Sequence, residues 1–269
     1  MARVFLLGHP VSHSLSPAMH NAAFAALGLP HRYETRDVDA AHLASAVGDL
    51  RRDDVLGANV TIPHKEAALR LVDDATAEAR EIGAVNTLIR RGTRVLGANT
   101  DVEGFARAVT AADGGPLLSG RTVLLLGAGG AARACAYVLL PTNRVLVANR
   151  TAERAREFAA QLEIEGRHAE AVAWPPAGAT LDADAVVNAT PLGMNGEDPL
   201  AGIDLPAIVV DIVPTAEETP LVRRAREAHH VVVVDGLSML LHQAARSFEL
   251  WTGASAPLEA MRAALPRRA

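Results

Sequence analysis

Lysine is nearly absent from this chain. Lysine and arginine together number 26, and Lys65 is the only lysine among them. Arginine keeps its proton near neutral pH, whereas a lysine can move a proton when its surroundings lower its pKa. Lys65 follows a polar stretch broken by proline (59–64, NVTIPH), which makes it a candidate for chemistry. A lysine retained by chance at the surface is the alternative, and the count alone leaves both open.

The chain also has a single cysteine and no excess of positive charge. Cys135 is the only cysteine, which excludes an intramolecular disulfide and favours a reducing compartment. The net charge of −5 offers no basic surface for nucleic acid. Apolar runs stay below the roughly 18 residues of a membrane helix, and the first residues lack the pattern of a secretory signal. We therefore expect a cytoplasmic protein without nucleic-acid or membrane partners.

The ten histidines do not predict a metal site. His9 and His13 are four residues apart, but Pro10 lies between them and argues against a shared helical face. No cysteine cluster accompanies them. We expect no bound metal.

The first hundred residues alternate between predicted strands and helices. Strands are expected at 3–8, 31–38 and 55–59, and helices after Pro17 and at 40–50. This order is typical of a mostly parallel sheet with helices on its faces. Ser16 before Pro17 predicts a helix N-cap. The hydroxyls of Ser14 and Ser16 beside free N–H groups also predict an anion site, with a simple cap as the alternative.

Two polar positions follow strand ends in this half. Thr61 and Lys65 come just after the strand at 55–59, at the sheet edge where α/β proteins bind ligands, and a helix is expected from about Pro63 to Leu71. Strands at 83–90 and 93–98 follow. Asp101 then precedes a predicted helix (102–112), where an N-cap is the commonest role of an aspartate.

The second half begins after a turn-rich junction at 113–120. An apolar strand (122–126) leads into Gly127-Ala128-Gly129-Gly130-Ala131-Ala132 and a helix. This matches G-x-G-x-x-A between strand and helix, where glycines let backbone N–H groups approach a pyrophosphate. Further strands are predicted at 144–148, 185–189, 209–213 and 231–235, with helices at 220–228, 236–251 and 255–265. The pattern predicts a doubly wound, Rossmann-type domain.

The end of the strand at 144–148 bears on the choice of dinucleotide. An NAD site usually offers an Asp or Glu there to the ribose 2′-hydroxyl. This chain has Asn149-Arg150-Thr151, with Arg154 one turn later. A guanidinium forks onto a phosphate, so the sequence favours NADP over NAD.

Taken together, these motifs resemble the shikimate dehydrogenase family over nearly the whole chain. The resemblance rests on the following segments: 13–17 (HSLSP), 59–65 (NVTIPHK), 83–87 (GAVNT), 99–101 (NTD), 127–132, 149–151, 188–194 (NATPLGM) and 236–243. It implies an enzyme that reduces 3-dehydroshikimate to shikimate with NADP(H), on the route to chorismate and the aromatic amino acids.

The resemblance also implies a two-domain α/β fold and a role for each part. Residues 1–101 would form the substrate-binding and catalytic domain. Residues 102–236 would form the NADP-binding, Rossmann-like domain. Residues 237–269 would return to the substrate domain as helices. Closure of the two domains on ligand binding is expected from this architecture.

Individual roles carry over by motif position. Lys65 and Asp101 would be the catalytic pair. The substrate-binding residues would be Ser14, Ser16, Thr61, Lys65, Asn86, Asp101 and Gln243. The cofactor-binding residues would be Gly127, Ala128, Gly129, Gly130, Ala131, Ala132, Asn149, Arg150, Thr151, Arg154, Thr190, Met194, Ile212, Gly236 and Met239. Of these, Met194, Gly236 and Met239 would lie near the nicotinamide.

One position departs from the family. The family commonly carries Asp-x-x-Tyr-x-Pro before a Thr-Pro-Leu run, and that tyrosine contributes to the substrate site. Aligned on Asp211 and Thr219, the tyrosine position here holds Pro214. A quinate/shikimate dehydrogenase with relaxed specificity therefore stays an alternative, as does a shikimate-binding regulatory module without catalysis. Monomer and homodimer are both open, as is whether Lys65 transfers a proton or only stabilises charge.

Overall fold

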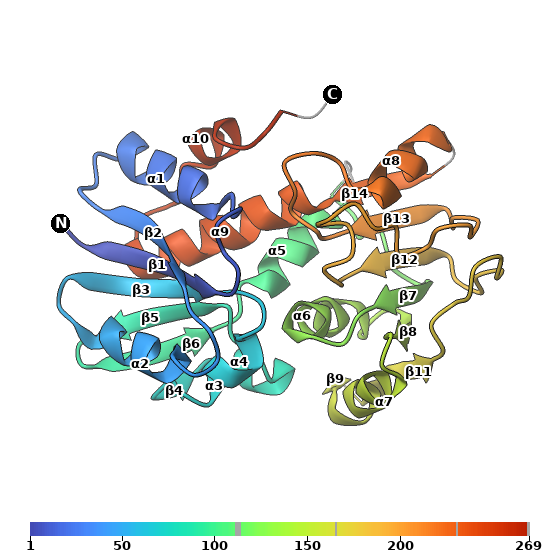
Figure 1. The fold of residues 1–269 in the computed structure, drawn as a ribbon, viewed down its shortest axis with the longest axis horizontal. Coiled ribbons are helices and arrows are strands. Elements are labelled where there is room, and N and C mark those ends of the chain that lie inside the picture. The colour runs from blue at the N-terminus through green and yellow to red at the C-terminus, as the bar shows by residue number, and fades with distance from the viewer. Residues whose placement is uncertain (111–113, 165, 230, 268–269) are drawn as a thin grey trace. The chain divides into compact units, whose positions relative to one another are not determined.

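The computed structural model describes residues 1–110, 114–164, 166–229 and 231–267 (Figure 1). The chain forms two compact units. The first contains Met1–Gly104 and Leu241–Arg267, and the second contains Phe105–Leu240. Within the described ranges, no helix is long and apolar enough to cross a membrane.

The first unit is built on a six-stranded sheet of order β2-β1-β3-β5-β6-β4. Its strands are β1 (Arg3–Gly8), β2 (Arg32–Asp37), β3 (Val55–Val60), β4 (Asp74–Ala75), β5 (Thr87–Arg91) and β6 (Arg94–Ala98). β1 lies between β2 and β3 and runs parallel to both, whereas β5 is antiparallel to β3 and β6. The predicted parallel sheet is confirmed, with one antiparallel hairpin added.

Helices cover both faces of this sheet (Figure 1). They are α1 (Ser16–Ala26), α2 (Leu43–Gly48), the 3-10 turn η1 (Asp49–Arg51), α3 (Lys65–Leu69), α4 (Ala77–Ile82) and α10 (Leu258–Ala263). α2, α3 and α4 lie on one face, and α1 and α10 lie on the other. α5 (Asp101–Ala108) and α9 (Gly236–Thr252) are the helices through which the chain passes between the units.

The second unit has an all-parallel sheet of order β11-β8-β7-β12-β13-β14. The elements are β7 (Thr122–Leu126), α6 (Gly130–Leu139), β8 (Arg144–Ala148), α7 (Ala152–Gln161), β9 (Glu163–Ile164), β10 (Arg167–His168), β11 (Glu170–Val172), β12 (Ala185–Asn188), β13 (Ile208–Asp211), α8 (Pro220–Glu227) and β14 (Val232–Asp235). If the six strands of this sheet are renumbered 1 to 6 in chain order from β7, their spatial order is 3-2-1-4-5-6, which is the order of dinucleotide-binding folds.

The central strands of that sheet are apolar apart from their end residues because both faces are covered. Val123 and Leu125 pack into the core that contains Phe158 of α7. Leu124 and Leu126 point the other way, into a core that contains Leu221 of α8. Alternate residues of one strand therefore serve two cores, which explains the unbroken apolar run at 123–126.

Two predictions about helix starts in the first unit are wrong. Ser16 is the first residue of α1 rather than its cap, and no side chain caps this helix. Instead, the Ser16 N–H donates to Ser14 Oγ at 3.2 Å. α3 begins at Lys65, not near Pro63, because residues 62 and 63 form a turn.

A third difference lies between 77 and 86. The sequence predicted a strand from Gly83, but Gly83 ends α4 with a left-handed φ of 76°. Thr76 Oγ1 caps that helix by accepting from the Ala79 N–H. β5 starts only at Thr87. A six-residue helix is too short for apolar periodicity to reveal, although its cap and its glycine stop are readable signals.

Candidate active site

Lys65 and Asp101 form an ion pair at the carboxyl-terminal edge of the first unit's sheet. Lys65 begins α3 just after β3, and Asp101 begins α5 just after β6. Lys65 Nζ lies 2.5 Å from Asp101 Oδ2, and the two side chains are only 14% and 6% exposed. The Asp101 carboxylate therefore holds the ammonium rather than capping its own helix. The structure brings together the two residues predicted to be catalytic, 36 positions apart in the sequence.

Asn86 connects this pair to α9. Its Nδ2 donates to Asp101 Oδ1 at 2.9 Å, and a longer contact of 3.4 Å reaches Gln243 Oε1. The side-chain oxygen of Asn86, Oδ1, accepts from the Thr100 N–H at 2.7 Å, which fixes the orientation of the amide. Asn86 and Gln243 are both buried. Four of the predicted substrate residues thus form one connected group within the first unit.

A second layer of polar side chains lies next to Asn86. Its members are Asn59, Thr87, Thr100 and Ser247, all with 5% exposure or less. Buried polar groups of this kind cost free energy unless they are paired, and here each one is. Sequence reasoning did not select Thr87, Thr100 or Ser247.

The two serines and Thr61 lie at the ends of neighbouring strands. Ser14 sits in the loop after β1 and Ser16 begins α1, while Thr61 directly follows β3. Because β1 and β3 are parallel neighbours, these ends meet at one edge of the sheet. Gly8 permits this close approach, since a Cβ there would overlap Thr61 Cγ2.

An aromatic cluster lies beside the polar layer. The His20 ring stacks on Tyr33 with centroids 4.4 Å apart and has Trp251 as a second neighbour at 5.2 Å. Complete burial lowers the pKa of His20 to about 3, so this histidine is neutral in the folded protein. The Tyr33 hydroxyl donates to Asn59 Oδ1 at 2.9 Å, which joins the cluster to the polar layer.

The glycine-rich loop of the second unit has the geometry that its sequence predicted. Gly127 follows β7 with a φ of +110°, and a Cβ there would lie 2.9 Å from the Ala189 backbone oxygen. Gly129 precedes α6, and Gly130 and Ala131 begin it. The first N–H groups of a helix have no acceptor within it, and they suit a phosphate. Ala128 and Ala132 are buried, and Ala132 packs in the core.

The end of β8 carries exposed arginines. Arg150 and Arg154 are exposed, and among the residues that the structure describes no carboxylate pairs with either one. Thr151 precedes α7, and Asn149 Nδ2 donates to the Thr151 backbone oxygen at 2.9 Å. Two cations without a carboxylate partner in the described chain, at this strand end, fit the 2′-phosphate of NADP.

A buried polar link joins the ends of β12 and β13. Asn188 Nδ2 donates to Asp211 Oδ1 at 3.0 Å, and Asn188 Oδ1 accepts from Thr190 Oγ1 at 2.7 Å. Asp211 Oδ2 accepts from Thr219 Oγ1 at 2.6 Å, and Thr219 caps α8. Sequence reasoning did not select Asn188, Asp211 or Thr219. The strand-end positions of Asn188 and Asp211 and the cap position of Thr219 before Pro220 were the available signals.

The remaining predicted cofactor residues are distributed around these strand ends. Met194 is 48% exposed in the loop after β12, and Ile212 directly follows β13. Gly236 starts α9, where a Cβ would lie 2.5 Å from the Val213 backbone oxygen. Met239 is buried in the core of the second unit.

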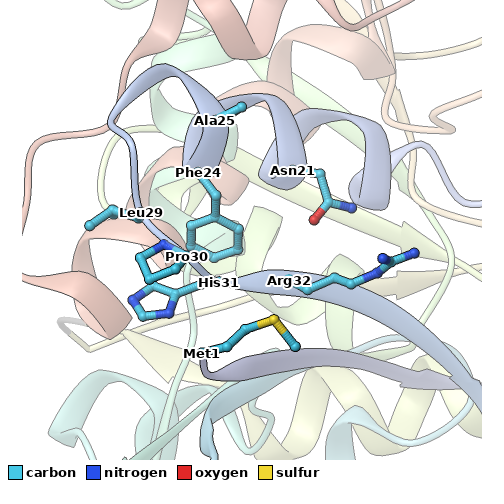
Figure 2. Close-up of a pocket in the computed structure, with 8 residues that line it drawn as sticks. All are labelled: Met1, Asn21, Phe24, Ala25, Leu29, Pro30, His31 and Arg32. Carbon is cyan, nitrogen blue, oxygen red and sulfur yellow. The ribbon is translucent and has the colours of Figure 1, made fainter.

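A surface pocket in the first unit contains none of the predicted residues (Figure 2). Its lining comes from Met1, from α1 and from the chain leading into β2: Asn21, Phe24, Ala25, Leu29, Pro30, His31 and Arg32. Both amide atoms of Asn21 bond to the Tyr33 backbone: Nδ2 donates to the Tyr33 oxygen, and Oδ1 accepts from the Tyr33 N–H.

Three family models match the chain. "Shikimate dehydrogenase substrate binding domain" matches residues 6–88, "Shikimate / quinate 5-dehydrogenase" matches 110–191, and "Shikimate 5'-dehydrogenase C-terminal domain" matches 236–265. A curated relative from Symbiobacterium thermophilum, named shikimate dehydrogenase (NADP(+)), is 43% identical over 96% of this chain and 92% of its own. The chain belongs to the shikimate dehydrogenase family.

Solved structures agree with this membership. The shikimate dehydrogenase of Thermus thermophilus, in complex with NADP(H) and shikimate, has a TM-score of 0.84 and 39% identity, with 98% of each chain covered. A 5-ketofructose reductase of a Gluconobacter strain has a TM-score of 0.83 at 31% identity, with 98% of this chain and 97% of the reductase covered. A protein named 5-ketofructose reductase therefore shares this fold.

Proposed function

We propose that this protein is an NADP-dependent shikimate dehydrogenase, which reversibly reduces 3-dehydroshikimate to shikimate in the shikimate pathway. The observation that carries the proposal is the buried pair of Lys65 and Asp101, tied through Asn86 to Gln243. The curated relatives, named shikimate dehydrogenase (NADP(+)), support the substrate and the cofactor.

Lys65 serves the oxygen of the carbonyl that is reduced. When NADPH is bound, it supplies the hydride, which no side chain of the protein can provide. An ammonium has three N–H donors, and Asp101 takes one of them, so others remain for the substrate oxygen. The alkoxide that develops there is stabilised by the positive charge and receives a proton. Asp101 orients the ammonium, and Asn86 orients Asp101.

The other substrate contacts follow from their positions in the first unit. Ser14 and Ser16 bind the carboxylate through their hydroxyls near the start of α1. Thr61, Asn86 and Gln243 contact the ring hydroxyls. These assignments rest on motif position and on the shared sheet edge of β1 and β3.

The second unit binds NADP(H). The N–H groups at the start of α6 hold the pyrophosphate, and Asn149, Arg150, Thr151 and Arg154 hold the 2′-phosphate. Met194, Gly236 and Met239 lie near the nicotinamide, and Thr190 and Ile212 also contact the cofactor. We propose the division of roles as residues 1–101 for substrate, 102–236 for cofactor and 237–269 for completion of the substrate domain. The proposed location is the cytoplasm, as a monomer or homodimer.

The test is direct. Purified protein is mixed with shikimate and NADP⁺, and NADPH absorbance is followed. The proposal expects turnover that depends on both compounds, with NAD⁺ a poorer acceptor by kcat/KM. A protein that binds shikimate without any reduction of NADP⁺ would instead be a regulatory module.

Quinate should be tested in the same assay, because Pro214 replaces a tyrosine that contributes to the substrate site in the family. The family's tyrosine hydroxyl is missing at this position. The match to a family model described as shikimate / quinate 5-dehydrogenase points to quinate as the competitor. Comparing kcat/KM for quinate and shikimate decides between a specific and a relaxed enzyme.

A further inference from the structure

We infer that Ser247 is a positioning residue for the reaction proposed above. Ser247 lies on α9, one helical turn after Gln243, and is completely buried. Its hydroxyl has four polar neighbours within 3.0 Å. None of the motifs that carry the family resemblance includes this residue.

The protons of this hydroxyl group and its neighbours can be assigned. A hydroxyl has one proton to donate and two lone pairs to accept with. The Gln243 backbone oxygen, 3.0 Å away, can only accept, so the Ser247 proton points to it. One lone pair accepts from Asn59 Nδ2 at 3.0 Å. The other is left for a threonine hydroxyl.

Two threonines compete for that lone pair. Thr87 Oγ1 is 2.8 Å and Thr100 Oγ1 is 3.0 Å from Ser247 Oγ. Both threonine hydroxyls also reach Asn86 Oδ1, at 3.0 and 3.1 Å. With Ser247 present, one threonine proton goes to Ser247 and the other goes to Asn86. Each buried hydroxyl is then satisfied.

The hydrogen bonds of Ser247 affect the catalytic pair, Lys65 and Asp101, through Asn86. Asn86 Nδ2 donates to Asp101 Oδ1, and Asp101 holds Lys65. Without the Ser247 hydroxyl, the freed threonine proton can turn to Asn86 Oδ1, which already accepts from the Thr100 N–H, or to the other threonine hydroxyl at a longer 3.2 Å. Thr100 Oγ1 itself accepts from Asn86 Nδ2 at 3.0 Å, so each arrangement alters the hydrogen bonds that orient the Asn86 amide. Ser247 therefore ties α9 to the strand ends that carry Asn86 and sets where the Lys65 ammonium sits.

The experiment uses Ser247→Ala, with Thr252→Ala as the matched control. Thr252 is on the same helix and makes the same type of hydrogen bond to the backbone oxygen four residues earlier, at 2.8 Å. Its hydroxyl also accepts from the Ala254 N–H, so it lies outside the polar layer. Because Lys65 is the only lysine, protein grown with ¹³C-lysine gives one lysine side-chain NMR signal, which reports on the site without turnover.

We expect Ser247→Ala to lower kcat about tenfold while the KM for shikimate changes less than about threefold. The lysine signal should move in Ser247→Ala and stay at the wild-type position in Thr252→Ala. Ser247→Cys fills the space with a poor hydrogen-bonding group and should show the same losses if the alanine variant does not fold. Wild-type kcat with an unmoved lysine signal in both Ser247 variants overturns the inference.

This inference rests on the proposed function, but the two fail differently. A wild-type protein that does not reduce NADP⁺ with shikimate refutes the proposed function. In that case the lysine signal still tests whether Ser247 positions Lys65. An active wild-type protein whose Ser247 variants keep full kcat refutes the positioning role alone.

Discussion

Replacing Lys65 by Met removes the ammonium and keeps an unbranched stem of similar length. Asp101 then keeps Asn86 as a donor but loses its cation, at 6% side-chain exposure. Turnover with shikimate and NADP⁺ should fall by about 10² to 10⁴, the range for removing one proton-transfer group. Binding of shikimate should change much less, because the other contacts remain.

The same substitution should destabilise the fold. Removing one partner of a buried ion pair costs about 3 to 5 kcal/mol, since an uncompensated charge is left behind. Lys65 is 14% exposed, so water reaches the site and we expect the lower end, about 3 kcal/mol. Adding Asp101→Asn removes that charge while keeping the shape. The double variant should therefore recover about 2 kcal/mol relative to additivity.

Urea denaturation of the wild type, both single variants and the double variant at about pH 7 measures this coupling. A calorimetric titration with shikimate separates binding from turnover. Arginine at position 65 is the control for charge, because it keeps the cation with a different shape and should still lose turnover. Additive free energies, together with a Lys65→Met enzyme of full activity, would refute the desolvated catalytic pair.

Three further predictions concern other parts of the chain. Arg150→Glu should lower kcat/KM for NADPH about 10- to 100-fold and leave NADH little affected, by steady-state kinetics. With the His20 pKa near 3 in the folded state and 6.5 as its ordinary value, the unfolded chain binds the extra proton between these pH values. Stability should therefore fall as pH drops below about 6.5, by about 2 to 3 kcal/mol at about pH 4.5, and His20→Phe should flatten this slope in urea titrations. Gly236→Ala should cost about 1 to 3 kcal/mol by thermal unfolding, whereas Gly48→Ala, with open space around it, should be neutral.

Long elements were predictable because their signals are local. The apolar runs at 123–126 and 145–148 follow from burial on two faces, and the glycines between strand and helix follow from a tight turn. Short elements were not. α4 and the two-residue strand β4 carry too few residues for periodicity. The predicted Ser16 cap is wrong because α1 already includes Ser16, whose N–H donates to Ser14 Oγ.

The chemical groups available to this protein can be read from its amino-acid sequence. The linear sequence shows one lysine among many arginines and a glycine loop after an apolar strand. It also shows Asn149-Arg150-Thr151 at the end of the next strand. Which of these groups come into contact depends on the folded chain. Lys65 and Asp101 are 36 residues apart, and Ser247 reaches Thr87 across 160 positions. Hydrogen bonds act over about 3 Å, so only the packed sheet and α9 could select these partners.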